Sequence, residues 1–147
     1  MKLAVEVMTI NDYDEVSALW ERSEGVGLDP DDTRECIGAY LDRNPALSFV
    51  ARDGDRLVGA VLCGHDGRRG YLHHLAVDHE YRRKGIGKAL SAKCIEGLRA
   101  AGIPKCNIFV FDQNDLALSF WEADGWVGRS DLRLLQKWTG IQDGVLE

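Results

Sequence analysis

The chain lacks any long apolar run. Nowhere in its 147 residues does it approach the ~20 consecutive apolar residues that cross a lipid bilayer. Positive charge is also scarce, because 24 acidic residues outnumber 18 lysines and arginines and give a net charge of -6 at pH 7. Proteins that bind nucleic acid through a broad surface carry the opposite balance. We therefore expect neither a membrane nor a nucleic acid as partner.

Cysteine pairing is missing as well. The four cysteines show no C-x-x-C pair and no metal-ligand spacing with histidine: Cys36, Cys63, Cys94 and Cys106. Each lies in or beside an apolar stretch, as the buried reduced thiols of cytoplasmic proteins do. We therefore expect a cytoplasmic protein without a metal site.

The length, together with the absence of repeats, low-complexity tracts and linkers, predicts one domain over residues 1–147. Apolar alternation and turn signals predict strands over residues 3–10, 47–52, 57–64, 71–77, 105–111 and 132–138. Apolar residues at helical spacing predict helices over residues 13–23, 33–44, 85–101 and 115–123. Because strands and helices are mixed without strict alternation, we expect an α+β fold around one largely antiparallel sheet.

Residues 81–90, YRRKGIGKAL, join a predicted strand to a predicted helix and concentrate positive charge and glycine there. The first turn of a helix exposes unpaired N–H groups and partial positive charge, and such a turn binds phosphate. Gly85 and Gly87 allow the backbone to approach a ligand closely. The segment therefore predicts a phosphate site, although a basic helix start with glycines for tight packing explains the same residues.

Two common phosphate-binding patterns are absent from this segment. The P-loop needs a hydroxyl residue after its lysine, whereas Ala89 follows Lys88. The dinucleotide pattern G-x-G-x-x-G needs a glycine where this chain has Leu90. The predicted phosphate ligand therefore belongs to another class.

The pattern Arg82-x-x-Gly85-x-Gly87, between a strand that ends in LAV and a long helix, resembles the acetyl-CoA motif of the GNAT N-acetyltransferase superfamily. Downstream, QNDLALSFWEADGW at residues 113–126 resembles the second block of that family, and the element order is similar over nearly the whole chain. Small bacterial YpeA-type members and the ribosomal-protein N-terminal acetyltransferases are the most similar subgroups. The resemblance implies the GNAT acyl-CoA N-acyltransferase fold, with a mixed, mostly antiparallel sheet, helices on both faces and splayed fourth and fifth strands.

The resemblance also implies that acetyl-CoA is the co-substrate. Main-chain groups at the end of the fourth strand would pair with its pantetheine arm as an added strand, and N–H groups of residues 83–88 would hold its pyrophosphate. A β-bulge in the fourth strand would aim an N–H at the thioester oxygen. The cofactor-binding residues implied in this way are Leu75, Ala76, Val77, Arg82, Arg83, Lys84, Gly85, Ile86, Gly87, Lys88, Asn114 and Trp121.

The reaction that the resemblance implies is direct acetyl transfer, in a ternary complex, to a primary amine such as a small cationic amine or a peptide N-terminus. Two family groups are replaced, because Trp121 stands at the usual acidic tyrosine and Phe109 at the glutamate base of the ribosomal-protein enzymes. The alternative is therefore an acyl-CoA-binding regulatory or interaction module with little or no turnover. Dimers are common in the family, so a homodimer is one assembly that the resemblance allows.

The catalytic candidates lie in YLHHLAV, which resembles the HLH-x-LAV segment of arylalkylamine acetyltransferases, where strand histidines relay the proton of the amine. His73 matches the second histidine and is our candidate base, while Tyr71 takes the place of the first and is a candidate proton donor. A structural role for His73 is one alternative, and a bound water that carries protons to solvent is another. Strand alternation predicts two faces, with Tyr71, His73 and Leu75 on one and Leu72, His74 and Ala76 on the other. His74 is expected to be structural.

The acceptor side is expected at residues 25–32, because this region walls the acceptor site in the family. The loop carries Asp29, Asp31 and Asp32 close to Glu24, and an acidic wall favours a cationic amine. A solvated acidic loop that caps the second helix is the alternative.

Overall fold

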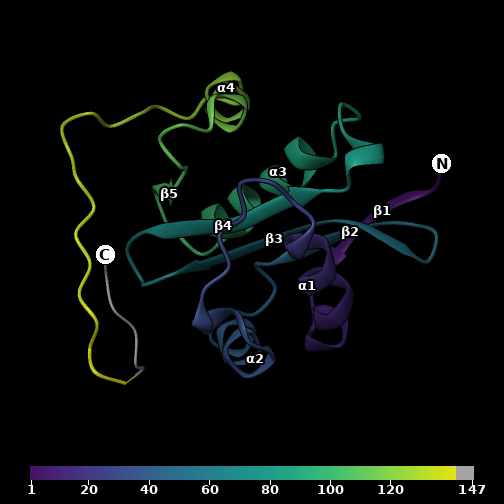
Figure 1. Ribbon diagram of the computed structural model, residues 1–147, viewed down its shortest axis with the longest axis horizontal. Coiled ribbons are helices and arrows are strands. Elements are labelled where there is room, and N and C mark those ends of the chain that lie inside the picture. Colours follow the sequence, from purple (N-terminus) through teal and green to yellow (C-terminus); the bar gives the residue numbers. More distant parts are fainter. Residues whose placement is uncertain (142–147) are drawn as a thin grey trace.

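The computed structural model describes residues 1–141 and contains one five-stranded sheet in the order β1-β2-β3-β4-β5 (Figure 1). Its strands are β1 (Leu3–Val7), β2 (Phe49–Asp53), β3 (Arg56–His65), β4 (Gly70–Val77) and β5 (Cys106–Ile108). The first four strands pair antiparallel, and β5 pairs parallel with β4. The predicted mixed, mostly antiparallel sheet is confirmed.

Four α-helices accompany the sheet over the described residues: α1 (Tyr13–Glu21), α2 (Arg34–Arg43), α3 (Ile86–Ala100) and α4 (Asp115–Ala123). Their start signals are local. Thr33 caps α2 by accepting a hydrogen bond from the Cys36 N–H, so the predicted role of the acidic loop as the cap of this helix is wrong. Asn114 caps α4 in the same way, accepting from the Ala117 N–H.

Helices cover both faces of the sheet, as predicted. In Figure 1, α1 and α2 lie below the sheet and α3 and α4 above it. On the α3 face the core includes Val61, Leu72, Leu90, Cys94 and Trp121. On the α1 and α2 face it includes Val16, Leu19, Trp20, Leu62 and Ala76. Among residues 1–141, none of the helices combines the length and the apolar character needed to cross a bilayer.

The pairing of β4 with β5 is short. It joins Gly70, Tyr71 and Leu72 to Cys106, Asn107 and Ile108, and it ends there. In the described part of the chain, residues 73–77 therefore have no strand partner on the β5 side. The predicted splay of the fourth and fifth strands is confirmed.

A β-bulge in β4 changes which face each side chain occupies. Leu62 pairs with His73 and Ala60 with Ala76, so both His74 and Leu75 lie opposite Val61. His74 adopts a φ of 53°, which few residues other than glycine do. His74 and Ala76 therefore share the α1 and α2 face with His73, and Leu75 turns to the α3 face. The predicted strict alternation is wrong beyond His73, because a bulge inserts one unpaired residue.

The predicted strand over residues 132–138 is wrong. The segment runs extended along one side of the molecule but pairs with no strand of residues 1–141 (Figure 1). Leu132, Leu134 and Leu135 are 60%, 62% and 89% exposed. An alternating pattern indicates which residues a strand would bury, but a strand also needs a neighbouring edge for its main-chain hydrogen bonds. The strand predicted over residues 105–111 is likewise shortened to Cys106–Ile108.

Candidate functional site

A cavity of about 760 Å³ opens where β4 and β5 diverge. Its walls come from β4, from residues 108–111 after the start of β5, from α4 and from the loop between α1 and α2. Four of the predicted site residues line it: His73, Leu75, Asn114 and Trp121. The fold therefore brings together residues from the two predicted sequence blocks.

The His73 ring lies in a stack of aromatic side chains. It is nearly parallel to the ring of Tyr71, at 6.2 Å between centroids, and it lies 6.2 Å from that of Phe109. Burial lowers the pKa of His73 below 6.5 and the charge of His74 lowers it further, against the opposing charges of Asp32 and Asp31. His73 is therefore held neutral at pH 7, as a proton acceptor must be. The predicted pairing of His73 and Tyr71 on one face is confirmed.

His74 lies in the same wall and contacts the acidic loop. Its Nε2 is 3.0 Å from both carboxylate oxygens of Asp32, and its main-chain carbonyl accepts a hydrogen bond from the Trp20 indole. Partial burial raises the pKa of Asp32, but the hydrogen bonds from His74 and from the Asp29 N–H outweigh it and leave the pKa below 3.8. This hydrogen-bonded contact joins β4 to the turn before α2 across the cavity wall.

The start of α3 exposes main-chain donors. Gly85 precedes the helix in the left-handed region, with a φ of 79°, and the first helical hydrogen bond runs from the Ala89 N–H to its carbonyl. The N–H groups of Ile86, Gly87 and Lys88 therefore have no acceptor within the helix. A Cβ added at Gly85 would meet no atom within 4 Å, so this glycine is not explained by packing. The open turn and its free donors fit a pyrophosphate.

The two glycines of the motif differ in role. A Cβ added at Gly87 would lie 3.2 Å from the Phe120 ring and 3.7 Å from Leu75, so Gly87 permits close packing of α3 against α4 and β4. Arg82 ties the turn to the strand, because its Nε donates to the Val77 carbonyl at 3.3 Å. The packing explanation from the sequence therefore holds for Gly87 and fails for Gly85.

Asn114 and Trp121 close the cavity from the α4 side. The Asn114 carbonyl oxygen caps α4, and its amide lies where a Cβ on Gly25 would approach to 2.5 Å. The loop between α1 and α2 therefore packs directly on Asn114. Trp121 is only 8% exposed, packed edge-on against Phe120 and Trp126.

Several lining residues had no functional prediction. Tyr40 of α2 lies edge-on to His73 at 6.3 Å between ring centroids, and its hydroxyl is buried without a hydrogen-bond partner among residues 1–141. The sequence places Tyr40 on the apolar stripe of a helix, where it reads as core. The extended segment over residues 132–138, called the extended tail below, contributes Leu134 and Gln136 to the lining. No pattern in the sequence indicates this contact.

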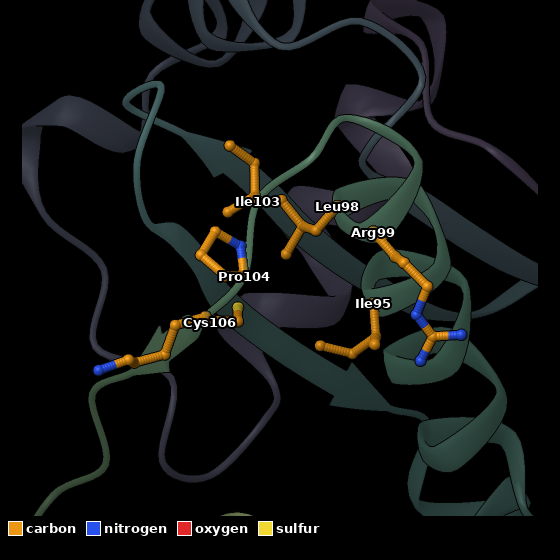
Figure 2. Close-up of a pocket in the computed structure, with 7 residues that line it drawn as sticks. Ile95, Leu98, Arg99, Ile103, Pro104 and Cys106 are labelled. Carbon is orange, nitrogen blue, oxygen red and sulfur yellow. The ribbon is translucent and has the colours of Figure 1, made fainter.

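A smaller hollow of about 310 Å³ lies between the second half of α3 and the chain that leads into β5. Figure 2 shows its lining residues, which include the apolar side chains of Ile95, Leu98 and Ile103 and the basic side chain of Arg99. It contains none of the predicted site residues.

Known proteins agree with this geometry. Residues 13–126 match the acetyltransferase (GNAT) family. An acetyltransferase from Sodalis glossinidius is 34% identical over 136 residues, which cover 92% of this chain and 94% of that protein. The solved structure of Ard1 from Thermoplasma volcanium has a TM-score of 0.76 at 20% identity and covers 86% of this chain and 84% of its own. The PaiA N-acetyltransferase from Thermoplasma acidophilum, solved with coenzyme A, also has a TM-score of 0.76 at 20% identity, over 85% of this chain and 89% of its own.

The family match spans most of the chain and includes the motif at the start of α3, and the relative in Sodalis is similar over nearly its full length. The open helix start has the donors that the diphosphate of coenzyme A requires. The chain thus belongs to the GNAT family and is an N-acetyltransferase that uses acetyl-CoA as its acetyl donor.

Proposed function

We propose that the enzyme transfers the acetyl group directly to a primary amine, either a small cationic amine or a peptide N-terminus, in a ternary complex. One observation carries this proposal. A single cavity is lined on one side by Leu75, Asn114 and Trp121 and on the other by the acidic loop with Asp29 and Asp32. Donor and acceptor can therefore meet inside it without a covalent enzyme intermediate.

We assign the donor half to the splayed edge of β4 and the start of α3. Past Leu72 the β5 side of β4 has no strand partner within residues 1–141, which supports pairing of Leu75, Ala76 and Val77 with the pantetheine arm. The pyrophosphate would be held by N–H groups of residues 83–88, next to the exposed cations of Arg83, Lys84 and Lys88.

The acceptor half is acidic. Carboxylate oxygens of Asp29, Asp31 and Asp32 lie within 4.8 Å of one another at the cavity wall. Such a concentration of negative charge attracts a cation and disfavours an anionic acceptor. This supports an ammonium group as the arriving form of the acceptor.

We assign the proton chemistry at the reacting nitrogen to His73 and Tyr71. The neutral amine attacks the thioester carbon, a C–N bond forms, and the C–S bond breaks with its electron pair on sulfur. His73 takes the proton that the nitrogen loses as the bond forms, because its lowered pKa keeps it neutral at pH 7. Tyr71, stacked on His73, gives its hydroxyl proton to the sulfur, and the proton held by His73 then restores that hydroxyl through water. A main-chain N–H at the bulge would stabilise the oxyanion.

One observation favours a second candidate, a binding module with little or no turnover. Trp121 occupies the position of the usual acidic tyrosine, and an indole N–H donates hydrogen bonds but is no practical acid. Phe109, at the position of the glutamate base, stacks on Tyr71 and His73 and carries no titratable group. If neither Tyr71 nor His73 moves protons, the cavity can bind an acyl-CoA without using it.

Release of free coenzyme A, followed with a thiol reagent, separates the two candidates. The panel contains spermidine, tryptamine and a peptide with a free N-terminus, with an acidic peptide blocked at its N-terminus as the negative control. We expect thiol release with at least one cationic amine and none with the blocked peptide. Tight binding of acetyl-CoA in calorimetry with no thiol release on any amine contradicts the enzyme proposal and supports the module.

We place this reaction in the cytoplasm. The four cysteines are unpaired, and Cys63 and Cys94 are buried in the core. Thiols persist in reducing compartments, which supports this location. Oxidative cross-links in protein purified from its native source would contradict it.

A further inference from the structure

The contact between His74 and Asp32 fixes a tautomer. An ionised carboxylate only accepts hydrogen bonds, so the His74 nitrogen that lies 3.0 Å from both Asp32 oxygens must carry the proton. In the neutral ring, Nε2 is then the donor and Nδ1 has the free lone pair. Both side chains are mostly buried, at 18% and 12% exposed, so the pair is held in one arrangement.

The Nδ1 atom is free to accept a proton. No residue within 1–141 donates a hydrogen bond to it, and it is not among the sealed polar atoms of that part of the chain. His74 itself lines the cavity. The backbone that carries the ring is fixed by the indole of Trp20, which donates to the His74 carbonyl at 2.9 Å.

The charged and titratable groups around His74 come from β4, from the acidic loop and from α2. On β4 the ring of His73 lies 6.4 Å away between centroids, and on α1 the neighbour is the uncharged ring of Trp20. The remaining titratable groups of the shared cavity are Glu24, Asp29, Asp31 and Asp32 of the loop and Cys36 and Tyr40 of α2. Most of these are carboxylates, so an ammonium group that enters the cavity is drawn toward His74.

The transfer reaction needs two proton acceptors. An acceptor that arrives as an ammonium ion loses one proton before it can attack and a second when the C–N bond has formed. His73 takes the second proton in the proposed function. The first needs its own acceptor, because a lysine-like amine has a pKa near ~10.4 and is almost fully protonated at pH 7.

We propose that His74 takes the first proton through Nδ1, with Asp32 as the positioning residue that holds the ring in the required tautomer. The proton passes from the ammonium nitrogen to Nδ1 and leaves a neutral amine. The positive charge on the ring then lies against the Asp32 carboxylate, and the proton leaves to water through the cavity mouth. The proposal rests on the proposed function for its reaction and on the Asp32–His74 contact for its geometry.

The activity test compares His74→Gln with Asp32→Asn over pH 7 to 9, using the best amine of the panel. We expect His74→Gln to lower kcat/KM about 100-fold at pH 7. The defect should shrink about tenfold for each pH unit, because the amine then deprotonates by itself. Asp32→Asn should lower kcat/KM about tenfold. The asparagine amide can donate a hydrogen bond to an unprotonated Nε2, so part of the His74 rings would adopt the Nδ1–H tautomer, which cannot accept a proton at Nδ1.

Asp31→Asn is the matched control, because it removes the same charge from the same loop without touching His74. It should raise KM for a cationic amine and leave the shape of the pH profile unchanged. A His74→Gln defect of equal size at pH 7 and 9, or an Asp32→Asn profile equal to that of Asp31→Asn, overturns the proposal. In the wild type the Asp32 carboxylate accepts a hydrogen bond from the Asp29 N–H at 2.8 Å. The side-chain oxygen of asparagine can accept the same bond, so the turn should survive in Asp32→Asn.

A second measurement does not depend on turnover. Proton–nitrogen correlation spectra of the imidazole rings distinguish the two tautomers. At pH 8 we expect His74 as the Nε2–H form in the wild type and as a mixture in Asp32→Asn. A wild-type ring in the Nδ1–H form overturns the proposal even if the enzyme is active. If the wild-type protein releases no coenzyme A with any amine of the panel, the proposed function is contradicted, and so is the catalytic step assigned to His74. The tautomer measurement still tests the contact between His74 and Asp32 in that case.

Discussion

The indole N–H of Trp20 donates a hydrogen bond at 2.9 Å to the main-chain carbonyl of His74, in the β-bulge of β4. Trp20 is almost fully buried in the core between α1 and the sheet. One side chain thus connects the packing of α1 to the strand segment that forms the cavity wall. At a bulge some hydrogen bonds between neighbouring strands are lost. Here a side chain from α1, outside the sheet, supplies one to the His74 carbonyl.

The Trp20→Phe substitution tests this connection. It removes the donor and part of a buried ring, so we expect the free energy of unfolding to fall by about 2–3 kcal/mol in denaturant titrations. Trp138→Phe, in the extended tail, is the matched control and should change it by less than about 0.5 kcal/mol. Equal effects of the two substitutions would show that the Trp20 contact contributes nothing.

Gly85 and Gly102 test the phosphate site. They lie at opposite ends of α3, both have a φ of 79°, and a Cβ on either would meet no atom within 4 Å. Alanine at either position therefore carries the same backbone strain, about 1 kcal/mol. In calorimetry with acetyl-CoA, Gly85→Ala should weaken binding about tenfold or more, a loss of ~1.4 kcal/mol.

Gly102→Ala should lower stability by the same amount as Gly85→Ala and leave acetyl-CoA binding intact. If both variants bind acetyl-CoA as the wild type does, the start of α3 does not hold the diphosphate.

His73 should give the protein a characteristic pH dependence. Burial lowers its pKa in the folded state below 6.5, so the unfolded chain takes up a proton at a higher pH than the folded one. Stability should therefore be full above about pH 6.5 and fall as the pH drops below that value. The rise of kcat/KM with pH should be centred below pH 6.5 for the same reason.

The His73→Gln variant should lose the rise of kcat/KM over this range and most of the acid-side loss of stability, with acetyl-CoA affinity unchanged. Thermal unfolding from pH 5 to 8 and initial rates over the same range provide the two measurements. An unaltered pH profile in the variant would assign the base role to another group.

The Tyr40 hydroxyl packs closely against Gly64 of β3. A Cβ on Gly64 would lie 2.5 Å from the Tyr40 hydroxyl and 2.6 Å from the Asn44 amide. Gly64→Ala should therefore destabilise the protein by about 1–3 kcal/mol through overpacking. Tyr40→Phe removes a hydroxyl that has no partner among the described residues, so it should cost little.

In the double variant the alanine should cost about 1 kcal/mol less than it does alone, as denaturant titrations of the full cycle would measure. Gly128→Ala, where an added Cβ meets nothing within 4 Å, is the neutral control. Strict additivity of Gly64→Ala and Tyr40→Phe would show that the hydroxyl is not the obstacle.

Local signals in the sequence predicted the elements that those signals specify. The turn at Gly54, the helix start at Gly85 and the end of α3 at Gly102 depend on short-range backbone preferences, and the structure has each of them. The bulge at His74 was expected from the family resemblance alone, because strand alternation assumes that every residue of a strand has its own partner. Whether a segment pairs with a sheet edge depends on residues far away in the sequence. For this reason the alternating pattern at residues 132–138 predicted a strand that the structure does not have.

The candidate site divides in the same way. The acetyl-CoA motif is contiguous in sequence, so its residues could be identified together. The contact of His74 with Asp32 joins residues that are 42 positions apart, through a turn that the sequence only indicates as acidic. No periodic pattern carries this information.

The short pairing of β4 with β5 determines how the enzyme can change. The slot proposed for the thioester is a gap between two main chains, formed where the β4–β5 pairing stops at Leu72, so it should survive the exchange of most surface side chains. The carboxylates that would attract the amine lie instead on the connection between α1 and α2, outside the sheet. Substitutions in this loop can therefore change which amine binds while the acetyl-CoA side of the cavity stays the same. A new amine acceptor would require new loop residues and no change of fold.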